Sequence, residues 1–126
     1  MSREIKFRYW HKKEKRFVYL KAINFIDDMV TYDCQGECNY VDIAPFDDIT
    51  PQQYTGLKDK NGVEIYEGDI VKATSDQYEN ENFVGKVIFD EGCFLTWINK
   101  NDIRGIWGED DIEVVGNIFE NSELLK

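Results

Sequence analysis

The chain has 126 residues, of which 42% are hydrophobic and 14% aromatic, and its formal net charge is −10. A chain of this length forms one domain or two small units, and its aromatic content can supply a core without metals or disulfides. No apolar run approaches the roughly 18 residues of a membrane-spanning helix, and residues 1–6 lack the apolar segment of a secretory signal, so we expect a soluble, cytoplasmic protein with no membrane partner.

The charge is distributed unevenly along the chain. Residues 1–22 hold eight Lys or Arg against two Glu, which gives +6 and leaves −16 for the remaining residues. This asymmetry has three explanations: attraction within the monomer or between subunits, a nucleic-acid-binding basic arm, or an acidic surface that binds a basic protein or mimics nucleic acid. The negative total disfavours non-specific DNA binding, which depends on neutralising phosphates with Lys and Arg.

The first fifty residues predict two β-hairpins. Residues 5–10 alternate apolar and basic side chains, as a half-buried strand does, and residues 16–23 return as a second strand after the polar turn 11–15. A further turn at Asp27-Asp28 leads to a strand at 30–32, and 40–43 forms its partner. A three-residue loop at 35–37 would place Cys34 opposite Cys38 and Tyr32 opposite Tyr40.

Residues 45–51, which begin and end with proline, predict a connector with one helical turn and a boundary between two subdomains, 1–50 and 51–126. The segment that follows, residues 53–71, contains Gly56, Gly62 and Gly68 at positions where the chain turns sharply. Asn61-Gly62 is a typical turn between strands, and Glu67-Gly68-Asp69 is a second turn before a strand at 70–74.

The last part of the chain predicts further short strands, at 83–89, 93–98 and 112–119, followed by a short helical tail capped by Asn121 or Ser122. Residues 75–82 predict a polar loop, and the structure and role of residues 99–111 stay open. No stretch has sustained helical periodicity. We therefore expect a mainly β protein with an SH3-like barrel in the C-terminal half and an N-terminal pair of β-hairpins packed on it.

Three blocks of sequence resemble the YopX family. They are residues 5–10 (Ile-Lys-Phe-Arg-Tyr-Trp), residues 53–71, and residues 115–125 (Val-Gly-Asn-Ile-Phe-Glu-Asn-Ser-Glu-Leu-Leu), and they occur in order over nearly the whole chain. The resemblance implies a mostly β fold with an SH3-like barrel component and a phage- or prophage-encoded protein that acts inside the host cell. It implies no established activity and no catalytic residues.

The candidates for a metal or catalytic site are few. A Cys₃His zinc site would use Cys34, Cys38, Cys93 and the single histidine, His11, but the spacing lacks a second close cysteine pair, so we expect free thiols in a reducing compartment. Nothing in the sequence places His11 beside a thiol as a Cys–His dyad requires. The acidic run at 109–111 could hold a divalent ion, although such runs are mostly solvated. We expect no cofactor and no enzymatic activity.

Basic and aromatic residues interleave in the N-terminal hairpin. Arg8, Arg16 and Lys21 alternate with aromatic side chains, which could stack on bases and bind phosphates, or could form the solvated face of a strand pair. The sequence favours a non-enzymatic protein-interaction module that binds an unidentified host or phage protein or forms a homo-oligomer. Nucleic-acid binding through Arg8, Arg16 and Lys21 is the alternative.

Overall fold

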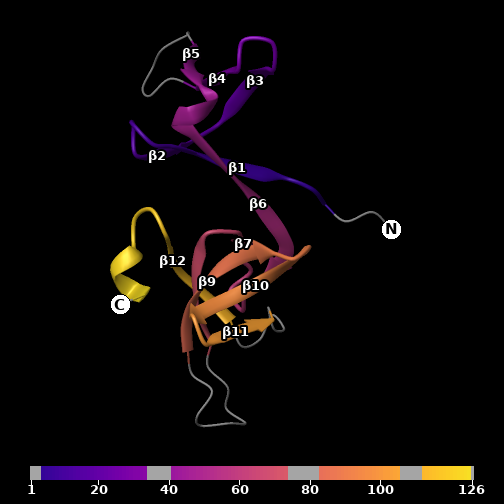
Figure 1. The fold of residues 1–126 in the computed structure, drawn as a ribbon, viewed down its shortest axis with the longest axis vertical. Helices are drawn as coiled ribbons and strands as arrows, with labels where there is room; N and C mark the ends of the chain where they lie inside the picture. The colour runs from indigo at the N-terminus through magenta and orange to yellow at the C-terminus, as the bar shows by residue number, and fades with distance from the viewer. Residues whose placement is uncertain (1–3, 34–40, 74–82, 106–111, 126) are drawn as a thin grey trace. The chain divides into compact units, whose positions relative to one another are not determined.

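The computed structural model describes residues 4–33, 41–73, 83–105 and 112–125, in which β-strands are the main secondary structure and the only helices are two short 3₁₀ turns (Figure 1). The prediction of a mainly β protein is confirmed. The chain divides into two compact units: the N-terminal unit, Phe7–Gln52, and the C-terminal unit, Met1–Lys6 with Gln53–Lys126. The sequence-based boundary after residue 50 lies two residues before the end of the N-terminal unit, and the packing of the hairpins on a barrel stays a prediction.

The N-terminal unit contains two antiparallel pairings joined by a bent strand. Its first strands are β1 (Phe7–His11), β2 (Arg16–Val18), β3 (Leu20–Asn24), β4 (Met29–Asp33) and β5 (Val41–Pro45). β1 pairs with β2, whereas β3 pairs with β4 in a sheet of order β3-β4-β5. Residues 16–23, predicted as one strand, are thus divided at Tyr19 between two pairings.

Asp33 stabilises the bend at Tyr19. The Tyr19 N–H donates to Asp33 Oδ1 at 2.7 Å, and the Asp33 N–H donates to the Tyr19 carbonyl at 3.0 Å. The polar backbone groups of the bend are therefore paired although the strand changes partner there. The core of the unit is formed by Val18, Val30, Tyr32, Ala44 and Ile49.

One predicted register is wrong. Tyr32 lies opposite Asp42, not Tyr40, so the register of β4 and β5 differs by two residues from the one that a loop at 35–37 would set. The proposed pairing of Cys34 with Cys38 falls outside the described residues.

The predicted connector is shorter than expected and is followed by a long strand. The connector is the single 3₁₀ turn η1 (Phe46–Asp48), and β6 (Ile49–Lys58) begins directly after it. The first residues of β6 belong to the N-terminal unit, and the rest pairs with β7 (Glu64–Tyr66) in the C-terminal unit. Pro51 lies within β6, and proline in a sequence argues against a strand.

The C-terminal unit contains a five-stranded antiparallel sheet of order β11-β10-β9-β8-β12. Its elements are β8 (Asp69–Ala73), β9 (Phe83–Asp90), β10 (Cys93–Asn99), β11 (Asp102–Gly105), β12 (Ile112–Asn117) and the 3₁₀ turn η2 (Ser122–Leu125). The predicted strands at 83–89, 93–98 and 112–119 are therefore present, and the last ends two residues early. Residues 75–82 and 106–111 lie outside the described residues.

The turn between β6 and β7 is held by Asp59, whose side chain is only 3% exposed. Its Oδ1 accepts the N–H groups of Asn61 at 2.8 Å and Val63 at 2.9 Å, and its Oδ2 accepts the N–H of Val114 at 2.9 Å. Burial alone would raise the pKa of the Asp59 carboxyl. The three N–H donors together stabilise the carboxylate more strongly, so the pKa of Asp59 is lowered. Gly62, in the same turn, has φ +80° as predicted.

The hydroxyl of Thr96 is buried in the C-terminal unit without a hydrogen-bond partner in the part of the chain that the structure describes. Ile65, Val71, Val87 and Ile112 are nearly or fully buried there, and Thr96 on β10 is 0% exposed. Among the described residues the Thr96 Oγ1 has no hydrogen-bond partner. A buried hydroxyl without a partner loses its hydration without compensation.

We expect Thr96→Val to stabilise the protein by about 1 kcal/mol, because valine keeps the shape and removes the unpaired hydroxyl. Urea unfolding would show a higher midpoint with an unchanged slope. Thr55→Val is the matched control, since the Thr55 Oγ1 donates to the Ile65 carbonyl at 2.7 Å. That variant should lose stability, and a loss of similar size in Thr96→Val would contradict the prediction.

Candidate interaction surface

An apolar groove of about 300 Å³ lies within the N-terminal unit. Strands β1, β3, β4 and β6, the β3–β4 turn and η1 all contribute to its walls. The lining residues are Phe7, Tyr9, Leu20, Ile23, Phe25, Val30, Phe46, Ile49 and Pro51. Its floor is formed by core residues such as Val30 and Ile49, so the groove is an opening onto the core rather than a separate cavity.

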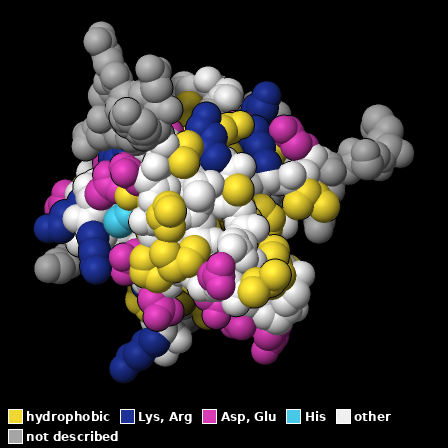
Figure 2. All heavy atoms as spheres, turned by 90° about the horizontal axis from the view of Figure 1, so that it is seen from above, with side chains coloured by type: hydrophobic (Ala, Val, Ile, Leu, Met, Phe, Trp, Pro, Cys, Tyr) yellow, Lys and Arg dark blue, Asp and Glu magenta, His cyan; other side chains and the backbone are white. Residues whose placement is uncertain are grey.

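The groove has exposed apolar walls. Phe7 is 45% exposed, Ile23 43% and Phe25 76%. Phe25 packs edge-to-face against Phe46, with ring centroids 5.9 Å apart. Figure 2 views the molecule from above and shows hydrophobic side chains at the surface with Asp and Glu among them. Contiguous apolar surface with a polar rim is typical of interaction sites.

The other face of the sheet β3-β4-β5 is also apolar. A hollow of about 400 Å³ there includes Ala22, Met29, Thr31 and Ile43 among its lining residues. Ile43 on β5 is 63% exposed and Val41 is 48% exposed. A sheet in which one face packs on a core normally presents polar residues on the other face. The N-terminal unit therefore exposes more apolar surface than its fold requires.

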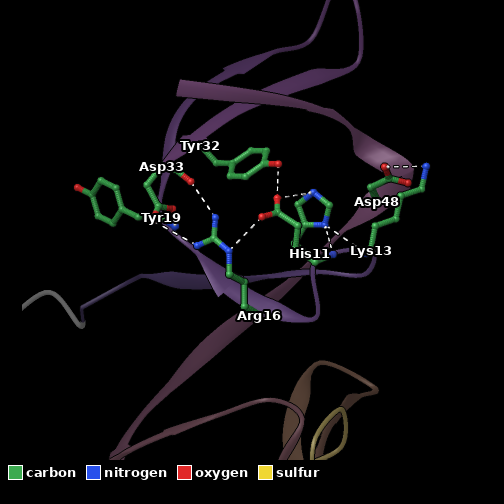
Figure 3. A network of polar contacts seen from close by, with 8 residues as sticks. His11, Lys13, Arg16, Tyr19, Tyr32, Asp33 and Asp48 are labelled. Carbon is green, nitrogen blue, oxygen red and sulfur yellow. Dashed lines mark hydrogen bonds and ion pairs between the residues drawn. The ribbon is translucent and has the colours of Figure 1, made fainter. Parts of the chain in front are cut away.

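A polar network centred on Glu14 fixes the β1–β2 turn (Figure 3). The Glu14 carboxylate accepts hydrogen bonds from the Tyr32 hydroxyl and from Arg16 Nε at 3.2 Å, and its Oε2 lies 3.3 Å from His11 Nε2. Arg16 continues the network through Asp33, with Nη2 donating to the Asp33 carbonyl at 2.9 Å. The network thus links β2 to β4.

His11 has a structural role in this network. It is 4% exposed, and its Nδ1 accepts the N–H groups of Lys13 at 3.2 Å and Glu14 at 3.1 Å. Because Nδ1 accepts, it carries no proton, and the ring proton lies on Nε2, facing Glu14. Both ring nitrogens of His11 therefore contact residues of the β1–β2 turn: Nδ1 contacts the backbone of Lys13 and Glu14, and Nε2 contacts the Glu14 carboxylate.

The network shifts several pKa values. The Tyr32 hydroxyl lowers the pKa of Glu14, and the Tyr19 N–H lowers the pKa of Asp33. Burial, together with the hydrogen bond to Glu14, raises the pKa of Tyr32 far above its usual range. Burial lowers the pKa of Arg16, whereas its carboxylate partners Glu14 and Asp33 raise it. The effect of the partners is larger, so the pKa of Arg16 is raised.

We expect the free energy of unfolding to decrease as the pH falls below about 4.5, the ordinary pKa of a Glu side chain. The pKa values of Glu14, Asp33 and Asp59 are lower in the folded state, so the unfolded chain binds protons first. The stabilisation is complete above the unfolded values and is lost as the pH falls through the folded ones. Urea midpoints measured from pH 7 to pH 3 test this, and midpoints that stay constant or rise below pH 4.5 would contradict it.

The structure does not present the three predicted basic residues as one free basic face. Arg8 Nε donates to Gln52 Oε1 at 2.7 Å, and the Arg8 guanidinium lies 4.5 Å from the Phe17 ring centroid. Arg16 is paired with Glu14 and Asp33. The Lys21 Nζ lies 5.2 Å from the ring centroid of the exposed Tyr19. Lys21 is thus the most accessible of the three.

The candidate metal ligands are not assembled among the residues that the structure describes. No group of three His, Cys, Asp or Glu side chains suited to a metal ion occurs among them. Cys93 is a free, exposed thiol. Cys34, Cys38 and the acidic run 109–111 lie outside the described residues, so the zinc and divalent-ion hypotheses stay untested.

The sequence profile described as "YopX protein" matches residues 6–126. The chain belongs to the YopX family. The fold is similar to the crystal structure of protein EF1440 from Enterococcus faecalis, with a TM-score of 0.65 and 28% identity over 99% of this chain and 100% of that one. It is also similar to the crystal structure of yopX from Bacillus subtilis, with a TM-score of 0.65 and 24% identity over 95% of this chain and 97% of that one. No curated protein matches the chain.

Membership of the YopX family confirms the resemblance of the three sequence blocks. Within the described residues of this YopX-family chain, no helix is long and apolar enough to span a membrane. The groove was not predicted, although one sequence signal pointed to it: Phe25-Ile26 precedes Asp27-Asp28 in a turn, where polar residues are usual.

Proposed function

We propose that this YopX-family protein is a non-enzymatic protein-binding module whose binding surface is the apolar groove of the N-terminal unit. The observation that carries the proposal is the exposure of Phe7, Ile23 and Phe25 around a groove of about 300 Å³. Exposed aromatic and aliphatic side chains around a concave apolar surface are what protein interfaces bury at their centres.

A non-enzymatic role is supported by how the titratable groups of the N-terminal unit are used. Glu14, Arg16, Tyr32 and Asp33 bond to one another or to backbone groups. The acceptor nitrogen of His11 is taken by two backbone N–H groups. General acid–base catalysis needs such groups within reach of a substrate proton, whereas here they hold a turn and a strand bend.

The same proposal includes the setting of the protein. The family resemblance supports a phage-encoded protein that acts in the cytoplasm of the host cell. The antiparallel five-stranded order β11-β10-β9-β8-β12 supports an SH3-like barrel as the architecture of the C-terminal unit.

Nucleic-acid binding is the second candidate function. It is favoured by Lys21, whose ammonium group lies near the ring of Tyr19, a side chain that is 71% exposed. An exposed aromatic ring beside a cation can stack on a base next to a phosphate. The pairing of Arg16 with two carboxylates and the net charge of −10 argue against it.

The test compares capture of proteins from a host lysate by three tagged chains. Ile23→Asp places a charge in the groove, and Val63→Asp is the matched control, because Val63 is 48% exposed and lies in the C-terminal unit. We expect the wild type and Val63→Asp to retain the same protein at near-equal ratio and Ile23→Asp to lose it. Backbone NMR spectra of both variants confirm that they are folded.

Two outcomes would reject the proposed function. Capture that is equal in all three chains would place binding outside the groove. Capture that disappears with nuclease and with Lys21→Glu, but not with Ile23→Asp, would establish nucleic-acid binding instead. Self-association that Ile23→Asp abolishes would satisfy the proposal, since the captured protein is then a second copy.

A further inference from the structure

The β3–β4 turn carries an apolar projection directly beside the groove. Phe25 forms part of the groove wall, and the next residue, Ile26, is 93% exposed. An exposed turn between two strands usually consists of polar residues, because its side chains lie in water. Two adjacent large apolar side chains at the tip therefore indicate a surface that is covered in the functional state.

The turn is held in one conformation before any partner binds. Asn24 Oδ1 accepts the N–H groups of Ile26 at 2.9 Å and Asp27 at 3.1 Å, and Asn24 Nδ2 donates to Asp27 Oδ2 at 3.0 Å. The Asp28 carbonyl accepts the Phe46 N–H at 2.9 Å, which ties the turn to η1. A preorganised projection loses little conformational entropy when it docks.

The projection and the groove are complementary in size and chemistry. A cavity of about 150 Å³ holds a benzene molecule, so the groove, at about 300 Å³, has room for a large apolar side chain and its neighbour. Both features lie on the same surface of the same unit. Such a surface is self-complementary, since each of two copies can offer its projection to the groove of the other.

The charges around these features also favour a second copy. The tip carries the exposed carboxylates of Asp27 and Asp28. The β1–β2 turn of the same unit carries Lys12, Lys13 and Lys15, all exposed, and Lys21 is exposed on β3. Because the acidic tip and these basic residues belong to the same unit, opposite charges of two copies attract each other.

We propose that the groove is occupied by the β3–β4 turn of a second copy of this chain, in a two-fold dimer in which each Ile26 side chain enters the partner groove. The dimer rests on the proposed function, because it uses the same groove and names its occupant. Four exposed large apolar side chains, Phe7, Ile23, Phe25 and Ile26, lie at the groove and at its turn, and such a cluster is what an interface buries at its centre.

Sedimentation equilibrium of the full chain over a concentration series tests the dimer. We expect a dimer for the wild type and an increase of about 100-fold or more in the dimer dissociation constant for Ile26→Asp, because the substitution removes both projections at once. Ile26 is almost fully solvent-exposed, so the fold should tolerate the change. Ile5→Asp is the matched control: Ile5 is 64% exposed and belongs to the C-terminal unit, and that variant should dimerise like the wild type.

Isotope-filtered NMR of a mixture of labelled and unlabelled chains provides a second readout. Contacts from the Ile26 methyl groups of one copy to the Phe7 or Phe46 ring of another would establish the docking. A wild type that stays monomeric at about 1 mM, the range of the weakest specific affinities, would overturn the dimer. So would a dimer that Ile26→Asp leaves intact.

The two proposals fail in different ways. If the wild type is monomeric but Ile23→Asp loses a captured heterologous protein, the groove is a binding site and only its occupant was wrong. If no protein binds the groove and the chain is monomeric, both proposals are rejected.

Discussion

Asp59→Ala should destabilise the protein by about 4 kcal/mol, since a buried donor that loses its acceptor costs about 1–3 kcal/mol and this carboxylate serves three. The variant leaves the N–H groups of Asn61, Val63 and Val114 without their acceptor. Against a typical total of about 5–15 kcal/mol, the loss is a large fraction of the stability. Urea unfolding measures it, and hydrogen exchange resolved by residue should show the loss across β7, β8 and β12.

Two controls separate the hydrogen bonds of Asp59 from the removal of a charge. Asp59→Asn keeps one oxygen that can accept from Asn61 and Val63 but turns an NH₂ group toward the Val114 N–H, so it should lose about 2 kcal/mol. Asp90→Ala removes an exposed carboxylate from the end of β9 and should change the stability by less than about 0.5 kcal/mol. An Asp59→Ala variant as stable as Asp90→Ala would show that the buried carboxylate does not hold the turn.

Glu14→Ala should have the largest effect in the N-terminal unit, a loss of about 3 kcal/mol. The substitution leaves the hydroxyl of Tyr32 and the Nε2–H of His11 without an acceptor, and both side chains are nearly fully buried. It also removes one of the two carboxylate partners of Arg16. Hydrogen exchange should accelerate in β1, β2 and β4, while the C-terminal unit stays close to wild type.

The controls for Glu14 test whether the effect belongs to the network. Glu14→Gln keeps an acceptor oxygen for Tyr32 and should lose about half as much. Lys13→Ala removes an ion pair with Asp48 in which the lysine side chain is 77% exposed, and such pairs contribute about 0–1 kcal/mol. A loss in Lys13→Ala equal to that in Glu14→Ala would attribute the effect to the turn itself rather than to the carboxylate.

Local signals in the sequence predicted most strands and the sharp turns. Alternating apolar residues and the Asn61-Gly62 pair depend only on neighbours in the chain, and Gly56, Gly62 and Gly68 all have positive φ in the structure. The strand β6 was missed because Pro51 argues against a strand in the sequence. The bend at Tyr19 was missed because its cause, the Asp33 carboxylate, lies 14 residues away.

The candidate surface depended on tertiary contacts that the sequence does not display. The same holds for Asp59 in the C-terminal unit. It lies in a polar turn sequence, which predicts an exposed side chain, but it is buried and accepts a hydrogen bond from Val114, 55 residues later. The groove likewise combines residues of β1, β3, η1 and β6, and no periodicity marks which apolar side chains a small core leaves uncovered. Arg16 illustrates the converse, since its charge suggested a binding role and the fold pairs it with two acidic residues.

The N-terminal unit is an insertion within the C-terminal unit, because the C-terminal unit takes residues from both sides of it. The Lys6 carbonyl accepts the Tyr54 N–H at 2.8 Å, and the Lys6 ammonium group pairs with Glu64. Synthesis on the ribosome proceeds from the N-terminus, and domains fold as they emerge. The inserted unit is therefore fully translated before the C-terminal unit, and its apolar groove forms first. Lys6, which precedes the inserted unit, pairs with residues that are translated nearly fifty positions or more later.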